Sequence, residues 1–206
     1  MRKYGFILLL IAFFGISYSQ TKVTVALDKS SILTIHGSTN LLSFKLIQFG
    51  ENIMNKPISV IATQQGAKLF LSQNKLSIGV NNFKSDNIIA QSEFYKLMKS
   101  DKYPYLKIQL NHFEIGGSSE GNQPTKGDAS INFTITGVTK QYNIPVIASL
   151  KGDYVSVSGR RKMNIKDFGL EPPLAMLGLV RVSEWIEIEF KILCKLTVDE
   201  KSLAID

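Results

Sequence analysis

The stretch that decides the fold is WIEIEFKILC, residues 185–194, near the end of the chain. Its apolar side chains, Ile186, Ile188, Phe190, Ile192 and Cys194, alternate with the charged side chains of Glu187, Glu189 and Lys191. A repeat of two residues is typical of a β-strand with one dry face and one wet face. The same alternation recurs in KVTVAL (residues 22–27), SILTIH (31–36) and several later segments. The chain is therefore predicted to be mainly β, with a shared apolar interior.

About nine or ten such strands are expected, and short polar turns such as GSTN (37–40) and GVTK (137–140) join many of them. Short connections favour antiparallel pairing. Strands that each carry one dry face must close into a barrel or fold into two packed sheets to hide that face. We predict a curved antiparallel sheet of about eight or more strands, interrupted by a polar, glycine-rich loop over residues 116–127.

One segment departs from the alternating pattern and predicts a helix. Residues 85–101, SDNIIAQSEFYKLMKSD, place Ile89, Phe94, Leu97 and Met98 at roughly helical spacing. Asp86 is expected to cap this helix, and Pro104 disfavours helix in the residue before it. We predict one inserted amphipathic helix whose apolar stripe lies against a sheet edge or closes one end of a barrel.

Residues 1–19 are predicted to be a leader that is not part of the fold. MRK is a positive n-region, residues 5–16 form an apolar core, and SYS (17–19) offers the small residues that a signal peptidase recognises. A membrane anchor is the weaker interpretation, because the apolar run is too short to span about 30 Å of hydrocarbon comfortably. We predict a signal peptide over 1–19, a barrel domain over 20–197, a polar tail over 198–206, and a periplasmic or secreted protein.

Composition excludes several classes of partner and site. The formal charge of +7 falls to +5 without Arg2 and Lys3, and the remaining lysines form no single patch, so no nucleic-acid partner is predicted. The single cysteine, Cys194, excludes an internal disulfide and lies on the dry parity of its strand, which indicates a small buried side chain. Two histidines, His36 and His112, are too few for a histidine-rich metal site, and no metal is predicted.

Catalytic signals are weak. The sequence contains no HExxH motif, no CxxC motif and no phosphate-binding loop, and its carboxylates are scattered over the wet faces of strands. We therefore predict a protein that is not an enzyme and that needs no cofactor.

The interior of the predicted barrel is the candidate binding site. By parity, the inward side chains are Leu33, Ile35, Phe44, Leu46, Leu106, Ile108, Leu110, Ile131, Phe133, Ile135, Val146, Ala148, Val155, Val157, Ile186, Ile188 and Phe190. A barrel of about eight strands is just wide enough to hold one slender ligand, and each buried methylene contributes roughly 0.8 kcal/mol. The alternative is that these side chains fill the interior themselves and leave no cavity.

Arg161 is the one charged candidate. It shares the parity of Val155 and Val157, so a regular strand would turn its guanidinium inward. A buried guanidinium needs a partner, and a pyrophosphate or quinone head group would supply one. A bulge at Gly159 would reverse the register and place Arg161 in water, and we expect this second arrangement.

Residues 172–180, PPLAMLGLV, are apolar, rich in Pro and Gly, and not periodic. They are predicted to form either a flap over a barrel mouth or an ordinary hydrophobic plug. In a flap, Leu174 and Leu177, together with Met176 and Leu179, would face a ligand or a membrane. Leu174 and Leu177 therefore join the candidate ligand residues, and a transient membrane contact is part of the prediction.

Four stretches in order carry a resemblance to a known family. They are LTIHGSTN (33–40), SEFYKLMKSDKYPYLKI (92–108), ITGVTKQYNIPV (135–146), and the pair MNIKDFGL (163–170) and MLGLVRVSEWIEI (176–188). Together they resemble the YceI-like family of exported bacterial proteins. The usual aromatic-Asp-x-x-His-Ser opening of that family is not present, and ALDKSS (26–31) stands in its region.

The resemblance implies a lipocalin-like, eight-stranded antiparallel barrel with a helical insertion and a periplasmic location. It also implies a long apolar cavity that binds isoprenoid-type lipids. The leading hypothesis is thus an exported protein that holds an apolar lipid in its interior. Two alternatives stay open: an envelope structural or interaction protein with a filled barrel, and a membrane-spanning barrel, which the single apolar face of each strand disfavours.

Overall fold

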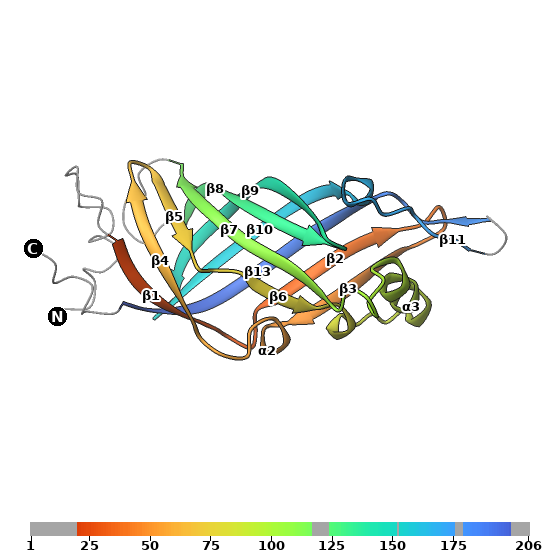
Figure 1. Ribbon diagram of the computed structural model, residues 1–206, viewed down its shortest axis with the longest axis horizontal. Coiled ribbons are helices and arrows are strands. Elements are labelled where there is room, and N and C mark those ends of the chain that lie inside the picture. Colours follow the sequence, from red (N-terminus) through yellow and green to blue (C-terminus); the bar gives the residue numbers. More distant parts are fainter. Residues whose placement is uncertain (1–19, 117–123, 152, 176–178, 199–206) are drawn as a thin grey trace, which may run out of the picture.

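The computed structural model describes residues 20–116, 124–151, 153–175 and 179–198. Eleven strands form one antiparallel sheet that curls into an elongated barrel, with β1 toward one end and β11 and α3 at the other (Figure 1). These strands are β1 (Gln20–Leu27), β2 (Ile32–Ser38), β3 (Ser43–Phe49), β4 (Ile58–Gln65), β5 (Lys68–Ser72), β6 (Leu76–Gly79), β7 (Tyr105–Ile115), β8 (Thr125–Ile135), β9 (Val138–Lys151), β10 (Tyr154–Asn164) and β13 (Trp185–Val198). The predicted mainly β, antiparallel fold is confirmed.

Smaller elements complete the fold. They are the helices α2 (Gly50–Ile53) and α3 (Ile88–Leu97), the 3-10 turns η1 (Val80–Asn82) and η2 (Ile165–Phe168), and a hairpin of β11 (Leu174–Ala175) and β12 (Val180–Arg181). The predicted leader over 1–19 and most of the predicted polar tail lie outside the described residues.

Eight strands close the barrel. In order around the ring they are β1, β4, β5, β7, β8, β9, β10 and β13, and β13 pairs back with β1. Closure uses both edges of β13, since Cys194 lies opposite Leu27 of β1 on one side and Val155 of β10 on the other. Full closure pairs the strand edges that would otherwise recruit other chains.

The ring divides along its length into two halves. The long strands β7 to β10 and β13 run through both. The rest of the ring is made of short strands, two of which follow one another along each flanking long strand. Thus β13 pairs with β2 over residues 187–191 and with β1 over 194–198. Likewise, β7 pairs with β6 over 105–108 and with β5 over 112–114. We call these two parts the β1–β4–β5 half and the β2–β3–β6 half.

Two buried polar side chains join the halves. Where one short strand replaces another, the long strand beside them loses partners for its peptide groups. Ser31, between β1 and β2, donates its hydroxyl to the Leu193 carbonyl at 3.1 Å and accepts from the Leu193 N–H at 2.9 Å. Asn74, between β5 and β6, donates to the Leu110 carbonyl at 2.7 Å and accepts from the Leu110 N–H at 2.9 Å. These side chains replace the missing bonds of the strand ladder.

The β8–β9 turn and the one shift in strand register among the described ladders were not predicted from the sequence. The β8–β9 hairpin turns through Thr136 and Gly137, which have φ of 48° and 88°. A two-residue turn with two positive φ angles matches the twist of the flanking strands. The predicted connection over 137–140 is therefore wrong, because the strand already begins at Val138. The ladder between β7 and β8 is shifted between Leu110 and His112, beside Asn74, and this irregularity was not predicted.

The predicted helix is confirmed as α3, with two corrections. Its cap is Asn87, whose side chain accepts from the Ala90 N–H at 2.9 Å, and not Asp86. Phe94, Leu97 and Met98 pack with the core of the β2–β3–β6 half, as the apolar stripe predicted. Ile89 is exposed, so its assignment to that stripe is wrong.

Replacing Asn74 tests the role of the buried polar joints. Asn74→Ala leaves the Leu110 N–H and carbonyl without their buried partner, and the free energy of unfolding is expected to fall by about 2 kcal/mol. Urea denaturation followed by circular dichroism measures the change. Asn55→Ala, at an exposed asparagine of the loop before β4, is the control and is expected to cost less than about 0.5 kcal/mol. Equal losses for the two variants would contradict the assigned role.

Candidate functional site

The strand register identifies the side chains that face the interior. Leu46, Ile35 and Ile188 lie opposite one another on β3, β2 and β13, and all three are buried. Nine predicted interior residues belong to one buried cluster: Leu33, Ile35, Leu46, Leu106, Ile131, Phe133, Ile135, Val146 and Ile188. Six more are partly buried against it: Phe44, Ile108, Leu110, Val157, Ile186 and Phe190. Because this cluster fills the β2–β3–β6 half, contact between these side chains and a ligand stays a prediction.

The interior of the β1–β4–β5 half is different. Val155 lies opposite buried Cys194, and Ala148 lies opposite Val157, so both predicted residues face inward. Both nevertheless remain partly exposed. We call the β1–β4–β5 half the open half, because its inward apolar side chains stay partly exposed while those of the other half are buried.

Neighbouring strands extend the same partly open surface. On β1 and β5 the inward side chains Val25, Leu69 and Leu71 are partly exposed. Leu150 and Leu196, on the inward parity of β9 and β13, are 49% and 37% exposed. The buried residues of this half, Val60, Ala62 and Cys194, stand outside the main core cluster. The core cluster reaches this half through partly buried side chains such as Leu27 and Phe113.

The sequence prediction omitted the inward residues of β1, β4 and β5. The alternation in KVTVAL (22–27) could have identified Val25, but KLFLS (68–72) has Phe70 between Leu69 and Leu71 and so presents apolar side chains on both parities. Periodicity alone could not choose the inward set there.

A row of paired residues follows one side of the ring where the two halves meet. Val146 lies opposite Gly159, Gly159 opposite Phe190, Phe190 opposite Leu33, and Leu33 opposite Gln48. A Cβ atom at Gly159 would lie 2.7 Å from the Phe190 ring and 2.9 Å from Val146. Glycine therefore lets these two side chains meet across β10. We call this row, where the two halves meet, the floor layer.

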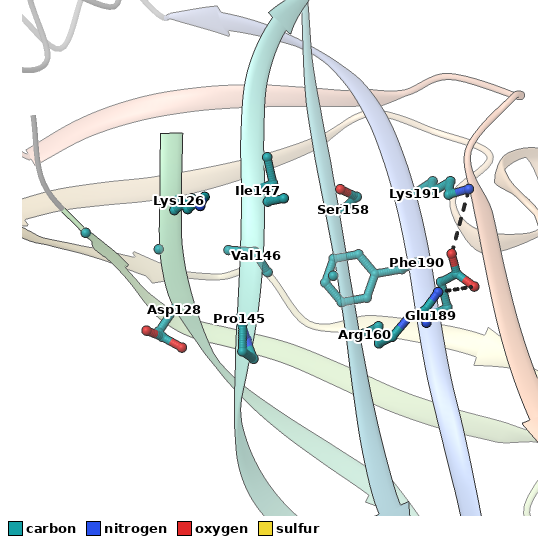
Figure 2. Close-up of a pocket in the computed structure, with 13 residues that line it drawn as sticks. Lys126, Asp128, Pro145, Val146, Ile147, Ser158, Arg160, Glu189, Phe190 and Lys191 are labelled. Carbon is teal, nitrogen blue, oxygen red and sulfur yellow. Dashed lines mark ion pairs between the residues drawn. The ribbon is translucent and has the colours of Figure 1, made fainter. Parts of the chain in front are cut away.

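A pocket of about 610 Å³ lies outside the barrel and not within it. Its lining comes from β8, β9, β10 and β13, and outward residues such as Lys126, Ile147 and Ser158 surround it (Figure 2). It is an open groove in the outer wall, over the place where Gly159 and Phe190 meet.

Three charged residues beside this groove, Arg160, Glu189 and Lys191, are paired with one another. Glu189 Oε2 lies 3.6 Å from Arg160 Nη2, and Glu189 Oε1 lies 3.7 Å from Lys191 Nζ (Figure 2). Glu189 Oε2 also lies 3.0 Å from His36 Nε2. Burial acts to raise the pKa of Glu189, but the hydrogen bond from His36 and the charges of Arg160 and Lys191 outweigh it, so the pKa is lowered. The paired charges and the open shape favour a solvated outer surface, and we do not place a ligand here.

The structure corrects the account of Arg161. Register is unbroken across Tyr154–Asn164, so the predicted bulge at Gly159 is wrong, and Arg161 lies opposite inward-facing Ile188. Arg161 is nevertheless exposed, because the pairing between β9 and β10 ends at Val146 and Gly159 and the two strands then part.

A tyrosine of β9, Tyr142, lies close enough to Arg161 to feel its charge. The Tyr142 hydroxyl donates to Asp167 Oδ2 at 2.6 Å, and its ring stacks on Phe168 of η2 at 6.2 Å between centroids. Burial and the Asp167 hydrogen bond raise the pKa of Tyr142, and the charge of Arg161 opposes the rise. Arg161 thus lies beside the packed half, beyond the floor layer, and its role toward a ligand head group stays a prediction.

Comparison with known proteins agrees with this architecture. A family model described as the YceI-like domain matches residues 54–193. The chain belongs to the YceI-like family. No curated protein matches it.

Two solved structures share the fold of this YceI-like chain. A polyisoprenoid-binding domain from Saccharophagus degradans, implicated in plant cell wall breakdown, is 12% identical with a TM-score of 0.57, over 88% of this chain and 100% of that one. BcnA of Burkholderia cenocepacia is 15% identical with a TM-score of 0.53, over 82% and 99% of the two chains. The predicted lipocalin-like barrel is confirmed.

The apolar segment over 172–180 does not plug the barrel of this YceI-like chain at Leu174. That side chain is exposed on the β11–β12 hairpin, so the plug interpretation is wrong for it. Met176 and Leu177 lie outside the described residues. Contact between Leu174 or Leu177 and a ligand stays a prediction.

Neither a metal site nor a spanning helix is found in the described part of the YceI-like chain. Within residues 20–116, 124–151, 153–175 and 179–198, no three His, Cys, Asp or Glu side chains lie close enough to hold a metal ion. Over the same ranges, no helix has the length and apolar character needed to cross a membrane.

The thiol of Cys194 gives a chemical test of the interior. The side chain is buried as predicted, and burial raises its pKa to about 11. Because the thiolate is the nucleophile, little of the reactive form exists at pH 8. We expect a thiol reagent at pH 8 to label the native protein at least about tenfold more slowly than the urea-unfolded protein. Equal labelling rates in the two states would contradict the inward placement of β13.

Proposed function

We propose that this protein binds the hydrocarbon chain of a lipid inside the β1–β4–β5 half of its barrel, and that it acts by binding and not by catalysis. The observation that carries the proposal is the partly exposed, inward apolar surface around Ala148, Val155 and Leu150. Apolar surface that faces an interior space gains free energy when a hydrocarbon replaces water, by roughly 0.8 kcal/mol for each buried methylene.

Fold and residue chemistry favour a slender, apolar guest. A ring of eight strands leaves room for one narrow ligand, not for a wide channel. The inward side chains of this half include Val25, Leu71 and Cys194, and none of these offers a charge. We infer that the ligand lies with its chain above the floor layer of Phe190 and Val146, and that a polar head group would remain at the rim in water.

The comparisons support an isoprenoid-type chain as the ligand class. The structure from Saccharophagus degradans is named a polyisoprenoid-binding domain, and it covers most of this chain. At 12% identity the likeness establishes the fold alone, so the ligand class is our proposal. A quinone or a prenyl pyrophosphate would satisfy the same requirement for a long apolar chain.

We also propose that the protein acts outside the cytoplasm, in the periplasm or after secretion. Residues 1–19 have the charge, apolar core and small terminal residues of a signal peptide. An exported protein with one cysteine has no internal disulfide, so the barrel must be held by its core and its strand ladder.

Filling the open half tests the proposal. Ala148→Trp adds a large side chain to the inward face, whereas Ile147→Trp places the same side chain on the outward face of the same strand. Displacing only two methylenes of a bound chain would lower affinity by more than about tenfold. We expect a farnesol titration to show this loss for Ala148→Trp and near-normal affinity for Ile147→Trp.

Native mass spectrometry of the wild-type protein supplies the complementary measurement. A co-purifying lipid of isoprenoid composition is expected in the wild type and depleted in Ala148→Trp. Thermal unfolding of both variants checks that the barrel remains folded. Wild-type protein that carries no lipid and does not bind farnesol would overturn the proposal and favour an envelope interaction protein.

A further inference from the structure

Two adjacent turns at one end of the barrel expose large aliphatic side chains. Leu41 and Leu42 lie in the turn between β2 and β3, and Leu174 and Leu179 lie on the β11–β12 hairpin segment. Their exposed fractions are 71% for Leu41, 49% for Leu42, 69% for Leu174 and 75% for Leu179. Single exposed leucines are ordinary, but four on neighbouring turns form an apolar patch.

Hydrogen bonds fix the two turns together. The Asn40 side chain donates to the Leu179 carbonyl at 3.0 Å and accepts from the Arg181 N–H at 2.9 Å. The Asn40 N–H donates in turn to the Arg181 carbonyl at 3.1 Å. Within the first turn, the Thr39 hydroxyl accepts from the N–H groups of Leu41 and Leu42 at 3.1 and 3.0 Å. These hydrogen bonds hold the backbone that carries the leucines in one conformation, which reduces the entropy lost when the leucines contact a surface.

We propose that this leucine patch, formed by Leu41, Leu42, Leu174 and Leu179, docks the protein on the surface of a lipid bilayer. Turns and the residues that flank them are normally polar, so exposed aliphatic side chains on two hydrogen-bonded neighbouring segments need an apolar environment to cover them. A few exposed aliphatic side chains are enough to insert between lipid head groups, whereas a stable protein interface needs about 800 Å² of matched surface on each partner.

The charge beside the patch favours an anionic bilayer. Arg181 is exposed on the same hairpin, and no carboxylate in the described part of the chain lies within ion-pair distance of it. A basic side chain near an anionic lipid surface adds about 1 kcal/mol of attraction, which corresponds to about fivefold in binding. The leucines and Arg181 together suit a membrane containing phosphatidylglycerol or a similar lipid.

Docking of the leucine patch on a bilayer is a second property of the protein, and it does not depend on whether a lipid is bound inside the barrel. The leucine patch lies at the β11 end, and α3 lies at the same end, whereas the β1–β4–β5 half lies toward the other (Figure 1). A protein with an empty barrel would dock equally well. Failure to find a bound lipid would therefore leave this inference standing, and failure to dock would leave the ligand proposal standing.

Vesicle flotation with the chain from Gln20 onward tests the inference. The probes are vesicles of phosphatidylcholine alone and of phosphatidylcholine with an equal amount of phosphatidylglycerol. We expect the wild type to float with the anionic vesicles, and Leu41→Ser with Leu42→Ser to lower the partition coefficient by about a hundredfold, about tenfold for each leucine. Arg181→Gln should lower binding to the anionic vesicles about fivefold and leave binding to the neutral ones unchanged.

Exposed aliphatic residues elsewhere provide the matched control. Val138 and Ile147 are also exposed, at 38% and 47%, and lie outside the leucine patch, so Val138→Ser with Ile147→Ser should bind vesicles as the wild type does. The inference is overturned if the wild type floats with neither vesicle, or if the control loses as much binding as the leucine variant. Self-association that depends on Leu41 and Leu42, without flotation, would overturn it in favour of a second copy as the occupant.

Discussion

The sheet can close only if every buried peptide group has a hydrogen-bond partner. Such partners are lost wherever one short strand ends and another begins beside the same long strand. Two positions around the ring are split in this way, and each contains a buried polar side chain: Ser31 between β1 and β2, and Asn74 between β5 and β6. Ser31 and Asn74 each bond both the N–H and the carbonyl of a residue on the facing strand. Another buried polar side chain, Gln48 of β3, donates to the Asn52 carbonyl and ties α2 to the end of β3. Without such partners, the buried peptide groups would favour water over the closed ring.

The split positions also explain why the barrel has two kinds of interior. The β2–β3–β6 half receives α2, α3, η1 and η2 in addition to its strands, and Phe83 and Met98, which follow η1 and α3, complete a solid core. The β1–β4–β5 half has no helix packed into it among the described residues, so its inward side chains stay partly exposed. Gly159 allows Phe190 and Val146 to meet between the halves. These two side chains mark the boundary between the packed core and the partly exposed interior.

Much of this architecture could be predicted from period-two alternation, because each long strand has one dry face: Ile188 and Val155 lie inward as expected. Alternation could not show which half was filled, since that depends on packing by segments distant in sequence. It also could not place the irregularities. Gly159 suggested a bulge, but this glycine relieves a collision with Phe190 and keeps a regular register. The shift in the ladder lies at Leu110, where no glycine or proline marks it.

Methyl-resolved NMR with an isotope-labelled isoprenoid chain tests the central claim most directly. If the β1–β4–β5 half receives the chain, contacts between ligand and protein will appear at the methyl groups of Ala148 and Val155, and none will appear at Leu46 or Ile188 in the packed half. Contacts confined to the outer wall, or no contact with any inward methyl group, would contradict the account.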